Sequence, residues 1–170
     1  KQYKITNSGG CTDVVTAQGS IDDAKDYQEV CQAFKDIGCD EGEIDAVWRT
    51  LAGILNLTEV QFEAIDADTG KFKDSTKAFL DGVEKHWKVD KAALEKALSL
   101  KLVTAAGNTT EVPLTATASE DDKNALIKSL YDNLFRWLVE KCNEATDAEA
   151  KGFDCGSQWI GLLDIFGFED

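Results

Sequence analysis

The stretch from Ser119 to Val139, SEDDKNALIKSLYDNLFRWLV, decides the fold of this chain. Its apolar residues recur at steps of three and four: Leu126, Ile127, Leu130, Tyr131, Leu134, Phe135, Leu138 and Val139. This spacing predicts one long helix near 120–145. Ser119 and the acidic residues that follow it predict a capping box at the start of the helix. Because the apolar stripe is wide, we expect other elements to surround most of the helix.

Four shorter helices are expected before this one. A capping box at Ser20–Asp23 predicts a helix that ends near Gly38, and a second start at Asp40–Glu43 predicts a helix with a strongly apolar stripe. Two more apolar patterns predict helices at about 75–87 and 91–101. The fold class is therefore mainly α.

A few β elements complete the pattern. Val60 and Phe62, with polar neighbours, indicate a short strand. The stretch 102–114 is rich in Thr and Val and is broken by Gly107-Asn108, which predicts a projecting β-hairpin. The apolar run Trp159–Leu163 is typical of a strand buried on both faces, as in a parallel sheet. Such a strand needs neighbours that the sequence does not contain.

Composition excludes several classes of protein. The chain has 170 residues and a net charge of −14, so it lacks the basic surface that nucleic acid or an anionic membrane requires. Five scattered cysteines form no Cys-x-x-Cys pair, which favours reduced thiols over a disulfide framework or a zinc site. No apolar run reaches the roughly 20 residues of a membrane helix. Because the chain has no Met, we expect it to be a piece of a longer protein.

The residues after the buried strand carry the clearest chemical signal. Asp164 would lie at the carboxyl end of the strand, where ligands bind in open α/β sheets. Asp-x-x-Gly at this place suits a nucleotide switch, because the carboxylate can hold Mg²⁺ through water and Gly167 lets a backbone N–H approach a γ-phosphate. The alternative is a plain buried strand followed by a turn.

Several motifs in order resemble the motor domain of the myosin family. Leu163–Glu169 is similar to the family's switch II signature, and Ala125–Lys128 with Tyr131 and Leu134–Val139 looks like its long central helix. Leu51–Leu57 resembles the Leu-Ala-Ala-Ile-Leu-His-Leu stretch of the family, with Asn56 in place of His. The match runs through essentially all 170 residues, and its departures suggest a divergent, unconventional myosin.

The resemblance implies a fold and a set of site residues. It implies that the chain is most of the upper actin-binding subdomain of an α/β phosphate-loop NTPase motor head, with a core strand and switch II at 158–170. Asp164, Ile165, Phe166 and Gly167 would then contact ATP, with Asp164 holding Mg²⁺ through water. Asp164, Gly167 and Glu169 would be the catalytic residues, and Glu169 would pair with an arginine of switch I.

The hairpin at 102–114 corresponds in the resemblance to a surface loop that contacts actin. Val103, Thr104, Thr109 and Thr110 are its candidate contact residues. Myosins carry an acidic or phosphorylatable residue there, about sixteen positions before the central-helix motif, which places Thr109 at that position when one deletion is allowed. The alternative is that Thr109 and the adjacent Thr110 are ordinary β-formers.

The resemblance implies an actin-activated Mg-ATPase in the cytoplasm and cytoskeleton, with F-actin and the rest of the myosin heavy chain as partners. Neither nucleic-acid binding nor direct membrane insertion is expected. The family's phosphate loop and switch I have no counterpart in this sequence, so the 170 residues alone are not expected to hydrolyse ATP. The alternative is a standalone interaction module with a myosin-like fold and no ATPase activity.

Overall fold

The structure is a computed structural model that describes residues 3–6, 15–16, 19–20, 22–105, 107–147 and 152. Within these ranges the chain is mainly α-helical, as the sequence predicted. The five helices are α1 (Asp23–Asp36), α2 (Glu41–Glu59), α3 (Lys77–Trp87), α4 (Lys91–Ser99) and α5 (Ala116–Thr146). A 3₁₀ turn, η1 (Asp74–Thr76), precedes α3.

The strands of the described residues pair into three two-stranded antiparallel sheets. These are β1 (Val15–Thr16) with β2 (Gly19–Ser20), β3 (Phe62–Ala64) with β4 (Gly70–Phe72), and β5 (Leu100–Ala105) with β6 (Asn108–Pro113). The first two pairings were not predicted from the sequence, which indicated only a short strand near Phe62. The predicted core strand Trp159–Leu163 lies outside the described residues.

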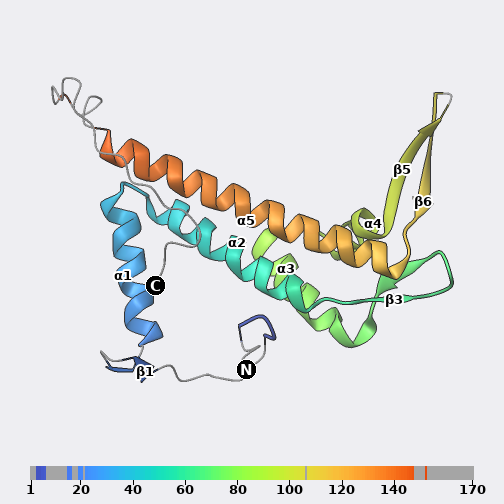
Figure 1. Cartoon of the computed structure of the whole chain (residues 1–170), viewed down its shortest axis with the longest axis horizontal. Helices are drawn as coiled ribbons and strands as arrows, with labels where there is room; N and C mark the ends of the chain where they lie inside the picture. Colours follow the sequence, from blue (N-terminus) through green and yellow to red (C-terminus); the bar gives the residue numbers. More distant parts are fainter. Residues whose placement is uncertain are drawn as a thin grey trace.

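Helices α2 and α5 lie side by side and antiparallel, and they form the long body of the molecule (Figure 1). Lys141 near the end of α5 pairs with Glu43 at the start of α2, with 2.7 Å between Nζ and Oε1. At the other end, Lys123 near the start of α5 donates to the carbonyl oxygen of Val60, just after α2. The hairpin β5–β6 projects from this second end, and α1 lies at the first (Figure 1).

Two hydrophobic clusters hold the body together. One lies where α2, α3 and α4 meet the β3–β4 sheet and the start of α5, and its buried members are Leu57, Val60, Phe72, Leu80, Val83, Leu94 and Leu98. The other lies where α1 crosses α2 and the end of α5, and its buried members are Phe34, Cys39, Ile44 and Val47. The predicted apolar stripe of α2 therefore faces the core.

Close approaches between helices explain two glycines. A Cβ on Gly53 of α2 would lie 1.9 Å from Nε1 of Trp87, so the indole occupies the space that a side chain would need. A Cβ on Gly82 of α3 would lie 2.2 Å from Oδ1 of Asn56 in the same way. Because both glycines lack side chains, α2 and α3 pack closely. Asn56 itself stays satisfied by donating to the carbonyl of Ala52 at 2.7 Å.

The start of α2 was predicted correctly, and two other helix starts were wrong. Asp40 caps α2 at the predicted start, and together with Glu43 it forms a capping box. In α1 the capping side chain is Asp22, which accepts from two backbone N–H groups, whereas Ser20 lies in β2. In α5 the cap is Thr115, which accepts from the Ala118 N–H at 3.2 Å.

The start of α5 is set by the strand that precedes it. Leu114 still hydrogen-bonds like a strand residue, because its N–H donates to Ser99 O and its carbonyl accepts from Gly70 N. The next residue, Thr115, is therefore the first that can cap the helix. Ser119, the predicted cap, lies in the first turns of α5, where it is fully buried and its Oγ has no hydrogen-bond partner among the described residues.

The expectation that other elements surround α5 is wrong for the described residues. One face of α5 packs against α2 through Leu134, Trp137 and Leu138. Tyr131 and Phe135 nevertheless remain 59% exposed, and Val139 is 42% exposed. The apolar stripe is wider than the surface that α2 offers, so part of the stripe faces solvent.

Candidate functional site

The predicted surface hairpin is formed by β5 and β6, which pair over six residues in a regular antiparallel register. Leu100 lies opposite Pro113 at the base, and Ala105 lies opposite Asn108 near the tip. Gly107 in the turn has a φ of +82°, in the left-handed region that favours glycine. The Gly-Asn signal in the sequence therefore marked the turn correctly, and the strands start two residues earlier than predicted.

The register divides the hairpin into two faces. Because facing residues of an antiparallel pair point to the same side, Thr104 and Thr109 share one face with Leu102 and Glu111. The other face carries Val103, Thr110, Lys101 and Val112. The four predicted contact residues are thus brought together at the outer half of the hairpin, two on each face.

A hydroxyl pair joins the two strands on the first face. Oγ1 of Thr104 and Oγ1 of Thr109 are 2.9 Å apart and share a hydrogen bond. Thr110 lies opposite Val103, whose side chain offers no hydrogen bond. The two threonines that the sequence could not distinguish therefore differ, because the Thr109 hydroxyl is engaged across the strands and Thr110 lies on the face with Lys101.

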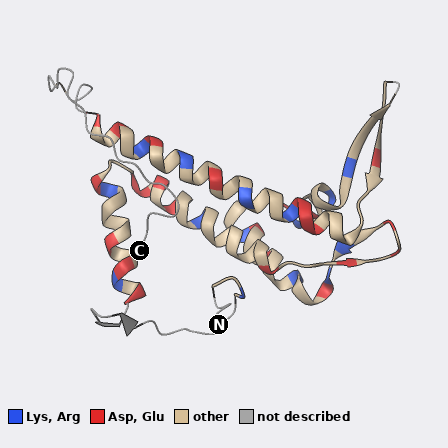
Figure 2. Ribbon diagram, viewed as in Figure 1, with Lys and Arg blue, Asp and Glu red and all other residues tan. Residues whose placement is uncertain are grey.

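The hairpin exposes apolar side chains to solvent. Leu102 is 71% exposed and Val103 is 41% exposed. The strands contain only two charged residues, Lys101 and Glu111, so the hairpin is nearly uncharged beside the rest of the chain (Figure 2). Because consecutive strand residues point to opposite faces, each face of the hairpin presents one of these exposed apolar side chains.

Three connections fix the base of the hairpin to the body. Leu114 N donates to Ser99 O at 2.8 Å, which extends the ladder beyond the two strands. Gly70 N donates to Leu114 O at 2.7 Å, which joins the base to β4. Nζ of Lys96 in α4 lies 2.6 Å from Oε1 of Glu111 in β6. The ion pair is exposed, so the backbone bonds supply most of the rigidity.

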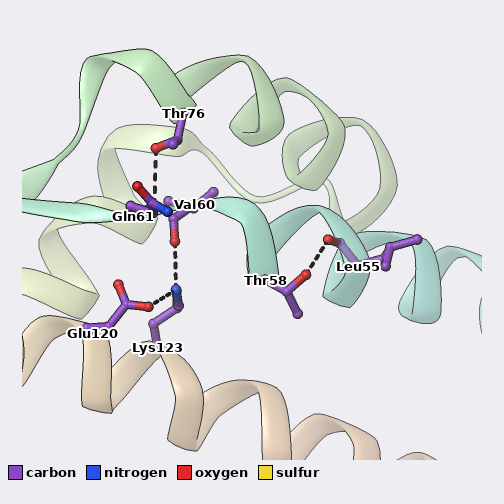
Figure 3. Close-up of polar contacts among 7 residues, drawn as sticks. All are labelled: Leu55, Thr58, Val60, Gln61, Thr76, Glu120 and Lys123. Atoms are coloured by element: carbon purple, nitrogen blue, oxygen red, sulfur yellow. Dashed lines mark hydrogen bonds and ion pairs between the residues drawn. The ribbon is translucent and has the colours of Figure 1, made fainter. Parts of the chain in front are cut away.

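A buried lysine then links the root of the hairpin to α2 (Figure 3). Lys123 is only 1% exposed, and its Nζ donates to the Val60 carbonyl at 2.6 Å and also pairs with Glu120. A buried ammonium group requires such partners, because its desolvation is otherwise very unfavourable. The first turns of α5, which continue directly from β6, are thereby held to the end of α2.

The other side of the same junction is held by η1 (Figure 3). The N–H of Gln61 donates to Oγ1 of Thr76 at 3.1 Å, and the Thr76 hydroxyl donates to the carbonyl of Lys73 at 2.9 Å. Lys73 N in turn donates to the carbonyl of Gln61 at 2.8 Å. The chain between α2 and β3 is therefore held by hydrogen bonds on both of its sides. Sequence reasoning missed this junction, because it assigned no role to Lys123.

Several groups distant from the hairpin have shifted pKa values, through ion pairs or through burial. The Lys141 ammonium, with the backbone N–H of Asp40, lowers the pKa of Glu43, and Glu43 raises the pKa of Lys141. Asp81 and Glu84 raise the pKa of Lys91. Burial raises the pKa of the Cys39 thiol. None of these groups lies on the hairpin.

The structure does not describe the predicted nucleotide and magnesium residues. Asp164, Ile165, Phe166, Gly167 and Glu169 all lie outside the described residues. Within the described ranges, no group of three or more His, Cys, Asp or Glu side chains is placed to hold a metal ion. The helices of the described part include none long and apolar enough to cross a membrane.

Comparison with known proteins gives a consistent result over the whole chain. The family model described as myosin head (motor domain) matches residues 1–170. Unconventional myosin ID of Drosophila melanogaster is 33% identical over 173 residues, which cover 99% of this chain and 17% of the relative. Myosin-1 of Sclerotinia sclerotiorum is 35% identical over 169 residues, which cover 99% of this chain and 13% of the relative. The chain thus spans about a sixth or less of these curated relatives.

Proposed function

The chain belongs to the myosin head family, and we propose that it forms part of an actin-based motor that couples ATP hydrolysis to movement along filaments. In this proposal the 170 residues supply most of the upper actin-binding subdomain. The rest of the heavy chain supplies the phosphate loop and switch I, and the motor works in the cytoplasm on the cytoskeleton. The family match over residues 1–170 is the observation that carries the proposal.

The hairpin β5–β6 is the proposed contact with F-actin. It projects from the body and exposes Leu102 and Val103, and its base is fixed by the Leu114 backbone bonds and the Lys123 junction. A rigid base lets an exposed apolar surface bind without first being ordered, which lowers the entropic cost of association. Because the strands carry one Lys and one Glu, we expect apolar and hydroxyl groups to dominate this contact.

Co-sedimentation of the 170-residue chain with F-actin tests this contact. Binding is expected to be weak, because one hairpin offers a small interface. Val103→Ala should weaken the binding, since it removes exposed apolar contact surface. Val139→Ala is the matched control, because Val139 has nearly the same exposure, 42% against 41%, but lies near the far end of α5. Equal loss of binding in both variants would refute the hairpin as the contact.

The nucleotide site is proposed from the family pattern at the end of the chain. Asp164 would hold Mg²⁺ through water, and Ile165, Phe166 and the Gly167 N–H would lie along the phosphates of ATP. Glu169 would pair with the switch I arginine when the loop closes. Asp164, Gly167 and Glu169 would position the attacking water, so catalysis would rest on orientation and charge stabilisation.

Titration with a fluorescent ATP analogue tests whether nucleotide binding requires the rest of the heavy chain. The isolated 170 residues should bind it only weakly, because the backbone N–H groups and lysine of the phosphate loop are elsewhere. The complete heavy chain should bind it tightly and show actin-activated hydrolysis. Micromolar binding by the isolated chain would contradict the first statement. A parent coding sequence without a phosphate loop and switch I would favour a standalone interaction module.

A negative charge at Thr109 or Thr110 is the proposed regulatory element of the hairpin. A phosphate there would add up to about two negative charges and would strengthen contact with a basic patch on actin. The two positions differ, because a charge on Thr110 shares its face with Lys101, whereas one on Thr109 shares its face with Glu111 and breaks the bond to Thr104. Co-sedimentation of the Thr109→Glu and Thr110→Glu variants with F-actin shows at which of the two positions a negative charge changes actin binding. If neither variant changes the binding, the proposed regulation of the hairpin is refuted.

A further inference from the structure

The three cysteines of the described part of the chain gather at one end of the body, although α1 and α5 are far apart in the sequence. Cys31 lies on α1, Cys39 lies between α1 and α2, and Cys142 lies in the last turns of α5. These elements meet at the end of the body opposite the hairpin (Figure 1). The proposed contact with actin lies at the other end, so the cysteines form a separate feature of the structure.

Cys39 and Cys142 flank the same ion pair. Nζ of Lys141, the residue before Cys142, lies 2.7 Å from Oε1 of Glu43. The other carboxylate oxygen of Glu43 accepts from the backbone N–H of Asp40, the residue after Cys39, at 3.0 Å. One carboxylate therefore joins the neighbours of the two cysteines and holds the end of α5 against the turn before α2.

The packing of α5 places Cys142 on the side of the helix that faces Cys39. Cys39 belongs to the buried cluster between α1 and α2, and Leu138 of α5 packs against that cluster. Cys142 lies one helical turn after Leu138, so its side chain leaves α5 on nearly the same face. The ion pair and the packing thus bring the two cysteines to one place from elements that are distant in the sequence.

The two thiols differ in their access to solvent. Cys142 is exposed, whereas Cys39 is only 6% exposed. A dissolved oxidant therefore reaches Cys142 first, since oxidation of cysteine follows exposure and thiolate character. Burial raises the pKa of Cys39 and charge on Cys142 raises it further, whereas the Lys141 ammonium lowers it and so favours the thiolate. Because the thiolate is the attacking form, Cys39 is suited to react with an oxidised Cys142.

Cys31 is the competing partner for Cys39, and its surroundings suit it less. It packs against the same cluster, but its thiol forms a hydrogen bond with the Tyr27 hydroxyl, which raises the pKa of that phenol. Tyr27 lies one turn toward the start of α1, whereas Cys39 lies beyond the end of that helix. The Cys31 thiol is therefore directed away from Cys39.

We propose that Cys39 and Cys142 are a redox modification site, at which hydrogen peroxide joins the two residues by a reversible disulfide. The Cys142 thiolate attacks peroxide, so the O–O bond breaks, hydroxide leaves and the sulfur becomes a sulfenic acid. The Cys39 thiolate then attacks this sulfur, so the S–S bond forms and the S–O bond breaks with release of a second hydroxide. The protons of the two thiols neutralise the hydroxides, so two thiols and one peroxide give one disulfide and two waters.

The disulfide would link the end of α5 covalently to the turn between α1 and α2. A small thiol such as glutathione would reduce it by thiol–disulfide exchange and restore both cysteines. Disulfides of this transient kind are the ones found in reducing compartments. The site does not depend on the proposed motor function.

Peptide mapping of the whole chain after treatment with hydrogen peroxide tests the site. Remaining thiols are blocked with iodoacetamide, and trypsin then places each cysteine on a peptide of its own, since it cleaves after Lys35, Arg49, Lys141 and Lys151. Mass spectrometry should find peptide 36–49 linked to peptide 142–151 as the main disulfide. The product should run as a monomer on a non-reducing gel, and dithiothreitol should separate the two peptides.

Two serine variants and one change of solvent locate the pair. Cys142→Ser should abolish the linked peptide and leave Cys39 as a free thiol, because the exposed partner is removed. Cys31→Ser is the matched control and should leave the yield unchanged. Neither Cys142 nor Cys31 is buried, so the fold should tolerate both variants. In urea the yield should fall at least about fivefold, because only the fold brings positions 39 and 142 together.

Four results would overturn the proposal. The first is a peroxide-treated chain in which the two peptides stay unlinked, whether or not Cys142 is oxidised. The second is a main disulfide that uses any other cysteine or that joins two chains into a dimer. The third is a loss of the linked peptide in Cys31→Ser. The fourth is an equal yield in the folded chain and in urea, which would show that the fold does not select the pair.

Discussion

The hairpin β5–β6 and the body around α2 are held together in different ways. In the hairpin, every described strand residue except Leu100 and Val112 is exposed, and the strands depend on their own ladder and on a few bonds at the base. In the body, Leu57, Val60 and Phe72 are fully buried, and Gly53 touches the Trp87 indole. The hairpin can therefore change its surface without loss of the fold, whereas the body tolerates little change.

The largest expected difference between the two regions comes from truncating one apolar side chain in each. Phe72 is fully buried and packs against the Phe62 ring at 4.8 Å, so Phe72→Ala should destabilise the chain by about 3–5 kcal/mol. Val103→Ala on the hairpin should change stability by less than about 1 kcal/mol. Urea unfolding followed by circular dichroism measures both. Similar losses would show that the hairpin is part of the core.

The second prediction tests the close contact between α2 and α3. Gly53→Ala should destabilise by about 1–3 kcal/mol, because the new methyl group displaces the Trp87 indole and overpacks the interface. The control is Gly42→Ala in the first turn of the same helix, where the nearest atom is Oδ1 of Asp40 at 3.2 Å. That change should stay within about 1 kcal/mol, because the gain in helix propensity offsets a small shift of the cap. Thermal unfolding measures the stability of both variants. Equal losses of stability would contradict the close contact between Gly53 and Trp87.

The third prediction concerns the Glu43–Lys141 pair at the end of the body opposite the hairpin. Lys141 lowers the folded-state pKa of Glu43, so the pair stabilises the fold above the ordinary glutamate pKa. This stabilisation should be lost as the pH falls through the lowered folded-state pKa. Glu43→Gln should therefore flatten the acid limb of a stability-against-pH curve measured by urea unfolding. An unchanged acid limb would show that the pair contributes nothing, as many exposed pairs do.

The sequence predicted what depends on local pattern and missed what depends on distant contacts. The four-residue leucine repeat located α5, and Asp40 with Glu43 located the start of α2. The cap of α5 was misplaced because Thr115 and Ser119 are both hydroxyl residues, and only the Leu114 backbone bonds select the first. The burial of Lys123 depends on Val60, 63 positions earlier, and no local pattern contains that information.

In the candidate hairpin, too, the local features could be predicted from the sequence and the long-range features could not. Gly107-Asn108 and the Thr-rich flanks were enough to predict the turn, because turn chemistry is local. The two faces follow from the register, and the register requires knowing which residues pair. The bond between Thr104 and Thr109 could therefore not be read from the sequence, in which Thr109 and Thr110 look equivalent.

The smallest expected effect tests how independent the hairpin is. Thr104→Val removes the hydroxyl pair at 2.9 Å but keeps a good β-former, so overall stability should change by less than about 0.5 kcal/mol. Hydrogen exchange should nevertheless speed up at the β5–β6 amides and stay unchanged in α2, because the strands open locally without unfolding the body. Thr50→Val is the matched control, since its Oγ1 bonds the Ala46 carbonyl within α2 and should leave exchange in the hairpin unchanged. If Thr104→Val accelerated exchange in both regions, the hairpin and the body would be one cooperative unit, and the independence inferred from burial would be wrong.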